Sequence, residues 1–543
     1  MLRYNKLSFA LVGAAALAGA QATTGINPLD RAFGAFVSPA MAEQAGGTLV
    51  VGWDQVPRHL NPAVQSGVAT AMPGAQVFAS LLRYDDEWNP QPYLAESWDV
   101  SEDGLEVTVR LVEGALFHDG VPVTSTDIAF SLDVVKEYHP FQTMFAPVDR
   151  VETPDDRTAV FHLEHAHPAI ILAMSPALLP ILPEHVYGDG QDVSGHPRNS
   201  DNPIGAGPFR VTEFDPDERV VLERFDDYFV EDRPFLDRVI INTIPDPSSL
   251  VLSIEAGELH MLPLLASPQQ IARLERDEMI DVTDRGYEAI GPLNWLAFNT
   301  AREPLDDPRV RQAISYAIDR DFFIDALMQG TAQPANTPLM PGSPFHHEGI
   351  GDYDVDHDRA NALLDEAGYE RGADGNRFSL TIDYIPGWPE QQRNAAEMIR
   401  SQLRDVGIQI EVRSAPDFPT WADRVSGHNF DLTMDIVFNW SDPVIGVHRT
   451  YLSSNIREGV IWTNTQSYRN ARVDDLLDAA ATETDEDARH ALYREFQEII
   501  HEDLPIYFFN VVPYHTAYRT EVGNPPLTVW GPLSPFDEVY LDQ

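Results

Sequence analysis

Hydrophobic and polar positions follow two different periods along most of this chain. Short runs rich in β-branched and aromatic residues alternate every second position or stay apolar throughout, which is typical of strands. These runs predict strands at 48–53, 106–112, 157–163, 209–214, 219–225, 238–244, 291–299, 378–385, 408–412 and 430–438. The segments between them contain helical patterns, so the sequence favours the α/β class.

Start and stop signals bound several of the predicted helices. Asp246-Pro247 and Asp307-Pro308 each offer an N-cap residue followed by a proline in the first turn. Gly368 and Gly407 each follow a segment with helical periodicity, where a helix-ending glycine is expected. The stretch 378–438 reads strand, helix, strand, helix, strand, which predicts βαβ units and a mostly parallel sheet.

The segment 84–205 differs from the rest of the chain in its predicted elements. It contains shorter strands, many turns and one clear helix at 124–138. We interpret it as a lobe inserted into the first α/β region, with the chain returning near 203–208.

Charge narrows the range of functions. The chain has 543 residues with 85 acidic and 37 basic side chains, for a formal net charge of -48. Such a surface repels phosphate backbones, which argues against general nucleic-acid binding. Only Lys6 and Lys136 are lysine. An acid-rich, lysine-poor surface suits high salt and predicts a salt-tolerant source, although an acidic secreted protein from an arginine-favouring genome is the alternative.

The N-terminus has the pattern of an export signal. Arg3 and Lys6 precede the apolar stretch Leu7–Ala20, which is shorter than a membrane span. Cleavage is expected after Ala22 or Ala42, and we favour Ala42 because a predicted strand begins at Thr48. The chain has no cysteine, which excludes disulfides, thiolate metal sites and a lipid-modified cysteine. We therefore expect a periplasmic protein without a lipid anchor.

Five phrases, in order, resemble one known family. They are LAESWDVSEDGLEVTVRLVEGALFHDGVPVTSTDIAFSLD (94–133), NPIGAGPFRVTEFDP (202–216), LAFNTAREPLDDPRVRQAISYAIDRD (296–321), ANALLDEAGY (360–369) and QSYRNARVDDLLDAAATETDEDARHALYREFQEIIHEDLP (466–505). The chain is similar to the family 5 extracellular solute-binding proteins, the oligopeptide-, dipeptide- and nickel-type receptors of ABC importers.

The resemblance implies a two-lobed periplasmic-binding-protein fold of class II, cluster C type, with an extra domain in the N-terminal lobe. Ligand would lie between the lobes, which close by hinge bending. We expect crossovers near Leu293–Asn299 and Pro505–Val511. The expected division is a signal peptide at 1–42, the first lobe at 43–83 and 206–295, the inserted domain at 84–205, the second lobe at 296–508 and a return to the first lobe at 509–543.

The resemblance also points to ligand-binding residues. Peptide-binding relatives carry a motif similar to W-x-x-D-x-x-x-P, whose acid pairs with the ligand's ammonium group. Here the matching stretch is Asp435–Pro443, and the acid falls on Asn439. An amide cannot supply that charge, so either Asp442 takes the role or the ligand lacks a free α-ammonium. The further candidates are Arg58, His59, Trp421, Phe438, Trp440, Asn455, Arg457 and Trp462.

Rival functions have weaker support. No G-x-S-x-G, H-E-x-x-H or G-x-x-x-x-G-K-[ST] motif is present, so we expect no enzyme activity and no cofactor. His162, His165 and His167 look like metal ligands, but His162 would point away from the other two on a strand. The sequence predicts a monomeric receptor for a short peptide or peptide-like solute that delivers it to an ABC permease. An opine, oligosaccharide, metal chelate or haem ligand, a secreted hydrolase and a periplasmic chaperone or sensor partner stay open as alternatives.

Overall fold

The computed structural model describes residues 46–386 and 389–542. The expected signal peptide and both cleavage positions lie outside the described residues. Within the described part of the chain, no helix is long and apolar enough to cross a membrane.

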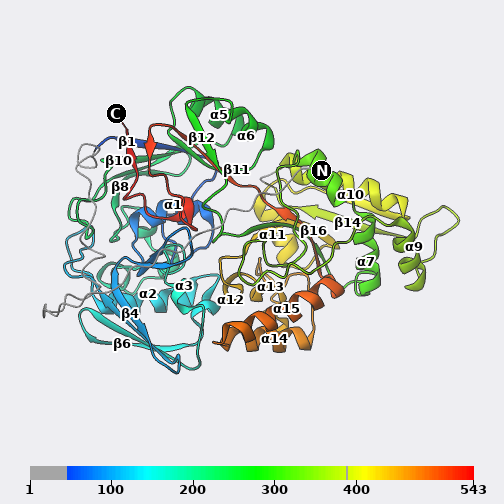
Figure 1. The fold of residues 1–543 in the computed structure, drawn as a ribbon, viewed down its shortest axis with the longest axis horizontal. Helices are drawn as coiled ribbons and strands as arrows, with labels where there is room; N and C mark the ends of the chain where they lie inside the picture. The colour runs from blue at the N-terminus through cyan, green and yellow to red at the C-terminus, as the bar shows by residue number, and fades with distance from the viewer. Residues whose placement is uncertain (1–45, 387–388, 543) are drawn as a thin grey trace, which may run out of the picture. The chain divides into compact units, whose positions relative to one another are not determined.

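A seven-stranded mixed sheet organises the first lobe (Figure 1). Strand β1 pairs in parallel with β10 and β11, whereas β8, β9, β12 and β18 form antiparallel pairs. In spatial order the strands are β12 (Ile280–Thr283), β18 (His515–Arg519), β11 (Met261–Leu265), β1 (Thr48–Trp53), β10 (Arg238–Thr243), β9 (Arg219–Arg224) and β8 (Phe209–Asp215). The sheet thus joins residues from both ends of the chain.

Three helices accompany this sheet. Helices α5 (Pro247–Glu255) and α6 (Pro268–Leu274) cover the apolar side chains of β1, β11 and β18, and α1 (Val68–Val77) contacts β8. The Asp246 side chain accepts a hydrogen bond from the backbone N–H of Ser249, which confirms the predicted helix start.

A separate four-stranded antiparallel sheet lies within residues 95–163. Its order is β4 (Ala95–Val100), β5 (Glu106–Leu111), β7 (Thr158–Leu163) and β6 (Val148–Asp155). Helix α2 (Ser125–Tyr138) packs on it and begins with a reciprocal capping box between Thr124 and Asp127. The shorter elements nearby are β2 (Leu82–Tyr84), β3 (Pro90–Pro92), α3 (Ile170–Ala173) and α4 (Glu184–Tyr187).

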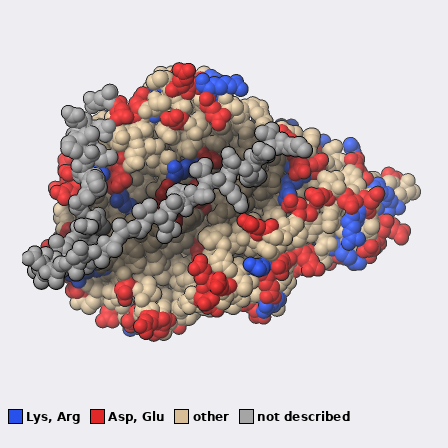
Figure 2. Space-filling model, viewed as in Figure 1, with Lys and Arg blue, Asp and Glu red and all other residues tan. Residues whose placement is uncertain are grey.

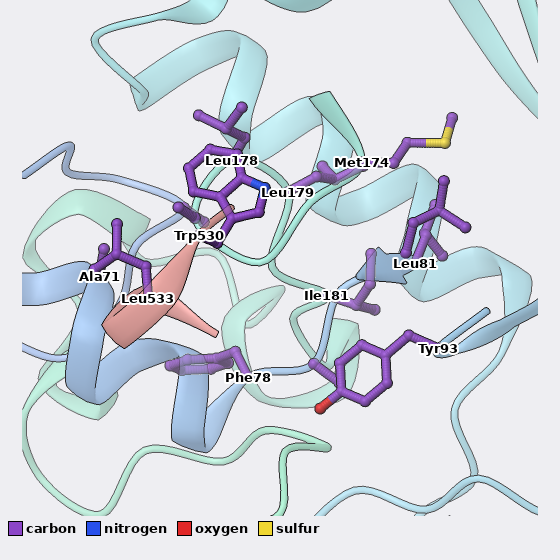
Figure 3. Close-up of a cluster of buried hydrophobic side chains, with 14 of the residues drawn as sticks. Ala71, Phe78, Leu81, Tyr93, Met174, Leu178, Leu179, Ile181, Trp530 and Leu533 are labelled. Atoms are coloured by element: carbon purple, nitrogen blue, oxygen red, sulfur yellow. The ribbon is translucent and has the colours of Figure 1, made fainter. Parts of the chain in front are cut away.

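One continuous hydrophobic core links this sheet to the first lobe. Figure 3 shows Trp530 and Leu533, close to the end of the chain, packed with Ala71 and Phe78 of the α1 region and with Leu178 and Leu179. Residues far apart in sequence therefore bury one another, and the small terminal pair β19 (Val522–Gly523) and β20 (Tyr540–Leu541) lies in the same segment.

The second lobe is built on a five-stranded sheet. Its order is β15 (Ile408–Arg413), β14 (Phe378–Tyr384), β16 (Leu432–Phe438), β13 (Pro292–Phe298) and β17 (Ile506–Val511). Strands β14, β15 and β16 are parallel, as the strand–helix pattern of 378–438 predicts. Strands β13 and β17 run antiparallel to their neighbours.

Helices cover both faces of this sheet. One face packs against α7 (Pro308–Ala317), α9 (His357–Glu366) and α10 (Pro389–Asp405), and the other against α14 (Ala471–Thr482) and α15 (Glu486–Asp503). The short helices are α8 (Arg320–Phe322), α11 (Phe418–Ser426), α12 (Pro443–Gly446) and α13 (His448–Tyr451). Gly368 and Gly407 follow α9 and α10 with positive φ angles of 91° and 88°, which confirms them as helix-ending glycines.

Two segments connect the sheets. Residues 284–291 lead from β12 into β13, and residues 512–514 lead from β17 into β18. The expected crossovers, Leu293–Asn299 and Pro505–Val511, instead belong largely to strands β13 and β17 of the second lobe. Both runs are apolar because the sheet buries them on both faces, and sequence alone does not separate such a strand from a connection.

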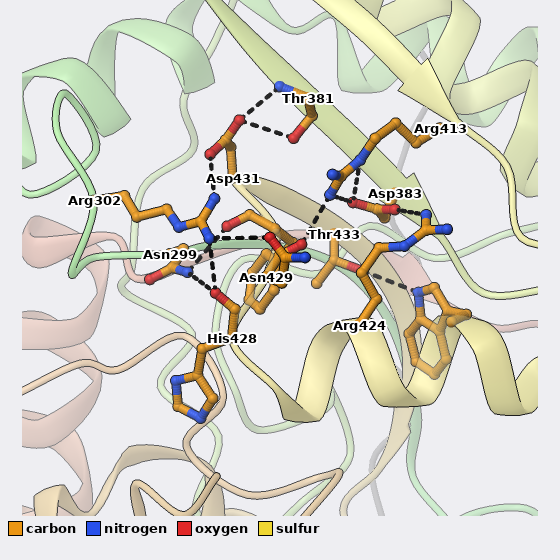
Figure 4. Close-up of polar contacts among 12 residues, drawn as sticks. Asn299, Arg302, Thr381, Asp383, Arg413, Arg424, His428, Asn429, Asp431 and Thr433 are labelled. Atoms are coloured by element: carbon orange, nitrogen blue, oxygen red, sulfur yellow. Dashed lines mark hydrogen bonds and ion pairs between the residues drawn. The ribbon is translucent and has the colours of Figure 1, made fainter. Parts of the chain in front are cut away.

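Ion pairs and hydrogen bonds of two carboxylates connect elements at one end of the second sheet (Figure 4). The fully buried carboxylate of Asp383 on β14 pairs with Arg413 on β15 and Arg424 on α11. One residue before β16, Asp431 accepts hydrogen bonds from the N–H and hydroxyl of Thr381 and pairs with Arg302 at 3.1 Å. These carboxylates tie three strands and a helix together.

Candidate functional site

The loop after β16 is bound to the first connection between the sheets. The backbone N–H groups of Asn439 and Trp440 donate to the carbonyls of Gly291 (3.1 Å) and Ile290 (3.2 Å). Trp440 and Ser441 adopt positive φ angles of 48° and 72°, which cost free energy for residues with a side chain. These contacts hold the Asn439–Asp442 loop in a fixed conformation beside the segment that joins the lobes.

Asp442 is committed to an ion pair. Its two carboxylate oxygens accept hydrogen bonds from Arg489 at 2.8 and 2.9 Å, and Oδ1 also accepts from the N–H of Val444 at the start of α12. Both side chains are buried, and Arg489 also donates to the carbonyl of Ala480. The negative charge of Asp442 is therefore already neutralised by Arg489 within the protein.

Asn439 offers no charge in this loop. Its side chain is 9% exposed, and Nδ2 donates to the carbonyl of Pro338 at 2.9 Å. The predicted choice between Asn439 and Asp442 as the ammonium-binding residue stays a prediction. In this structure the Asn439 side chain is an uncharged amide, and the Asp442 carboxylate is paired with Arg489.

A second acid of the same stretch is buried nearby. Asp435 on β16 accepts hydrogen bonds from the N–H of Ile436 and from Trp462 Nε1 at 3.1 Å. Burial raises the pKa of Asp435 to about 7, although these hydrogen bonds and the positive charge of Arg449 act in the opposite direction. Burial also lowers the pKa of Arg449 to about 10. The positive charge of Arg449 therefore acts on the buried carboxylate of Asp435, although the two side chains form no direct ion pair in the described part of the chain.

Aromatic side chains bring the inserted segment against this region. Phe141 follows α2, and its ring lies 4.6 Å from the Arg449 guanidinium and 5.4 Å from the ring of Trp440. Trp440 also packs against Phe438 and Trp530, at ring distances of 5.8 and 6.3 Å. Residues of the second lobe are thereby part of the core of the first. The cation–π and aromatic contacts favour the packing of the inserted segment against the second lobe.

An open cavity of about 420 Å³, here called the interlobe pocket, lies beside this loop. One side is formed by Tyr84, Trp88 and Pro90 of the β2–β3 hairpin and by Pro168, Ile171 and Leu172. The other side comes from the loop 340–345, from the Asn439–Asp442 loop and from residues 483–489 at the start of α15. Glu288 of the first connection completes it. Its volume lies within the range of about 300–1,000 Å³ typical of small-molecule sites.

The other predicted site residues lie in different surroundings. Arg58 is exposed, and His59 accepts a hydrogen bond from the N–H of Asn61, with a pKa lowered to about 4 by burial and by Arg58. Trp421 is fully buried among Ile385, Val425 and Phe430, so in this structure it packs in a core. Asn455 donates to the carbonyl of Arg449, and Arg457 is exposed. Of the ten candidates, Asn439 and Asp442 line the interlobe pocket.

Sequence reasoning did not single out Trp88, Glu288, Phe141, Arg449 or Arg489. Arg489 lies inside the last family-like phrase, but only its contact with Asp442, 47 residues earlier, reveals its role. The histidine group is also explained by its contacts. His162 lies 3.2 Å from both Glu106 and Glu152, and His167 Nε2 contacts the carbonyl of Met144 at 2.7 Å. Among the described residues, no group of three His, Cys, Asp or Glu side chains is arranged to hold a metal ion.

Comparisons with known proteins agree with this architecture. The dipeptide-binding protein of Escherichia coli K12 is 28% identical over 442 residues, covering 76% of this chain and 79% of its own. Heme-binding protein A of Haemophilus influenzae is 28% identical over 522 residues, covering 90% of this chain and 92% of its own. The oligopeptide-binding protein AppA of Bacillus subtilis, solved in complex with a nonapeptide, superimposes with a TM-score of 0.80 at 25% identity, over 92% of this chain and 100% of that structure.

A sequence model of a protein family, described as bacterial extracellular solute-binding proteins, family 5 Middle, matches residues 89–458 of this chain. The match includes, in full, four of the five phrases that carry the resemblance, all except 466–505. The two large sheets provide the two lobes expected for the fold. The chain belongs to the family 5 extracellular solute-binding proteins.

Proposed function

We propose that this protein is the periplasmic receptor of an ABC importer and that it captures a short peptide or peptide-like solute between its two lobes. The ligand favours the closed arrangement by its difference in affinity for the two states. The closed receptor then docks on a membrane permease and releases the solute chemically unchanged. It acts as an exported monomer without a lipid anchor.

The observation that carries this proposal is the interlobe pocket. Residues from both lobes line it, and the only chain segments between the two large sheets, among the described residues, are 284–291 and 512–514. A ligand held there touches both lobes at once. Such a ligand stabilises the arrangement in which the lobes are together, which is the physical basis of hinge closure.

A peptide is favoured over other ligands by two relatives, which are named for dipeptide and oligopeptide binding. A third relative is named for heme binding and covers as much of this chain, so haem belongs in the same screen. Since Asn439 supplies no carboxylate, we infer that recognition does not depend on an ion pair between this position and a free α-ammonium.

The test is direct binding. Native mass spectrometry of gently purified protein should reveal a co-purified peptide, and thermal-shift screening with di- to pentapeptides, opines, oligosaccharides and haem should raise the melting temperature with peptides only. Recovery of the bound peptide at its original mass separates a receptor from a hydrolase. Stabilisation by haem or an opine alone, or cleavage of the peptide during incubation, would overturn the proposal.

A further inference from the structure

We infer that the interlobe pocket selects a ligand in which a positively charged group is attached to an apolar body, such as a peptide with an arginine or lysine next to a hydrophobic residue. This inference rests on the proposed function and names its substrate class. It follows from the walls of the pocket, from the charges at its rim and from the ion pairs that those charges do or do not make.

The walls of the pocket are apolar on both lobes. They include Tyr84 and Trp88 on the first lobe, Ile171 and Leu172 beside them, and Met340 and Phe345 on the second lobe. All six side chains are buried or half-buried. Contact with them removes apolar surface of a ligand from water, which favours binding of an apolar group.

Trp88 is held at the pocket by a turn built around Asp85. The Asp85 carboxylate accepts hydrogen bonds from the backbone N–H groups of Glu87 and Asn89, both at 2.9 Å, and from the side chains of Asn89 and Gln91. Trp88 itself has a φ of 67°, a conformation that costs free energy for a bulky residue. The turn therefore fixes an aromatic side chain at the wall of the pocket.

The charges at the pocket do not cancel. Asp442 and Arg489 neutralise each other through their two short hydrogen bonds. Three further carboxylates remain, Glu288 from the first connection and Glu483 and Glu486 from the segment that leads into α15. Among the described residues, Glu288 accepts a hydrogen bond only from the N–H of Gly286 and Glu483 only from the N–H of Asp485, while Glu486 lies 3.7 Å from His490.

No arginine or lysine of the described chain forms an ion pair with these three glutamates. A ligand cation would supply the missing partner from between the two lobes, and the aromatic walls would strengthen the attraction by cation–π contact and by excluding water. An anionic ligand would meet like charges on the first connection and on the second lobe. The pocket thus favours cations by geometry and not merely by the overall negative charge of the protein.

The test uses three tetrapeptides that differ in one side chain: Ala-Phe-Arg-Ala, its citrulline analogue, which is nearly isosteric but neutral, and Ala-Phe-Glu-Ala. Isothermal titration calorimetry with the full mature protein should give about tenfold tighter binding for the arginine peptide than for the citrulline peptide. The double variant Glu288→Gln/Glu483→Gln should reduce this ratio to about threefold or less.

Glu278→Gln is the matched control, because Glu278 is an exposed glutamate outside the pocket. It should leave the ratio unchanged, which excludes a general effect of net charge. Equal binding of the three peptides, or an unchanged ratio in the double variant, overturns the cation selectivity but leaves the receptor function in place. Failure of all three peptides to bind overturns both.

Discussion

At the residue scale, the stretch Asp435–Pro443 shows how position decides the role of similar side chains. Asp442 forms an ion pair with Arg489, so its charge stabilises the protein at neutral pH. Asp435, seven positions earlier, forms no ion pair with any residue that the structure describes and accepts hydrogen bonds from Ile436 and Trp462. Asp442 is thus paired with a cation, whereas burial brings the pKa of Asp435 to about 7.

Asp435 gives a prediction about pH. Because its folded-state pKa of about 7 lies above its ordinary value of 3.8, the folded protein retains the proton over a range in which the unfolded chain has lost it. Its contribution to stability is therefore largest at acid pH and is lost as the pH rises towards 7. Asp435→Asn cannot ionise, so the stability of the wild type relative to this variant should fall between about pH 4 and about pH 7.

Urea unfolding across this pH range measures the difference. Asp226→Asn, at an exposed aspartate, is the control and should show no such trend. A difference between wild type and Asp435→Asn that stays constant with pH, or that grows in favour of the wild type as the pH rises, contradicts the prediction.

At the element scale, Asp431 joins parts of the second sheet that are distant in sequence. It lies one residue before β16, receives two hydrogen bonds from Thr381 on β14 and pairs with Arg302, which follows β13. Burial alone would raise its pKa, but the hydrogen bonds from Thr381 and the charge of Arg302 hold the pKa of Asp431 below its usual value. The carboxylate form therefore stabilises the register of three strands (Figure 4).

We expect Asp431→Asn to lower the free energy of unfolding by about 1–3 kcal/mol at pH 7, since one or more hydrogen bonds to a charged group are lost. The loss should shrink as the pH falls through the folded-state pKa, where the wild-type carboxylate is protonated as well. Denaturant unfolding at neutral and acid pH measures both effects. Thr381→Val removes one donor only and should cost less; a larger loss for Thr381→Val would argue against a central role of Asp431.

The sequence predicted most elements because periodicity is local. The strands of the 378–438 segment and the caps at Asp246 and Asp307 were predicted within a residue or two, since each depends on neighbouring positions. The site was harder. Arg489 on α15 is the partner of Asp442, and Trp462 in the loop after α13 is a partner of Asp435. No local sequence pattern predicts either contact. Trp421 illustrates the reverse case, since its residue type suggested a cleft while its packing is internal.

At the scale of the whole molecule, Phe141 connects the two lobes. Its ring lies 4.6 Å from the Arg449 guanidinium and 5.4 Å from the Trp440 ring, both of the second lobe. Phe141→Ala should weaken the closed arrangement and so reduce the affinity for a bound peptide by about tenfold, because the ligand must supply the lost closing free energy. Phe141→Leu keeps much of the apolar contact and should have a smaller effect.

Calorimetric titration with the co-purified or screened peptide measures these affinities, and far-UV circular dichroism checks that both variants fold. Equal affinity of Phe141→Ala and the wild type would show that this contact does not contribute to closure.

Acidic side chains are more abundant than basic ones on the molecular face shown in Figure 2, mainly towards its edges, in line with the net charge of -48. The sequence-based prediction of a salt-tolerant protein leads to a test. Screening by added KCl should raise the melting temperature, and the rise should level off near about 1 M, where the Debye length is about 3 Å. A melting temperature that is independent of KCl, or that rises without levelling off, contradicts screening of self-repulsion as the cause.

The two connections at 284–291 and 512–514 restrict the freedom of the lobes in a specific way. A body attached at one point can swivel in any direction, whereas attachment at two points leaves mainly rotation about the line through them. Ligands of different size would then be accommodated by different closure angles about this one axis. The lateral alignment of the two walls of the pocket, and with it the relative position of Glu288 and Glu483, would be the same for every ligand.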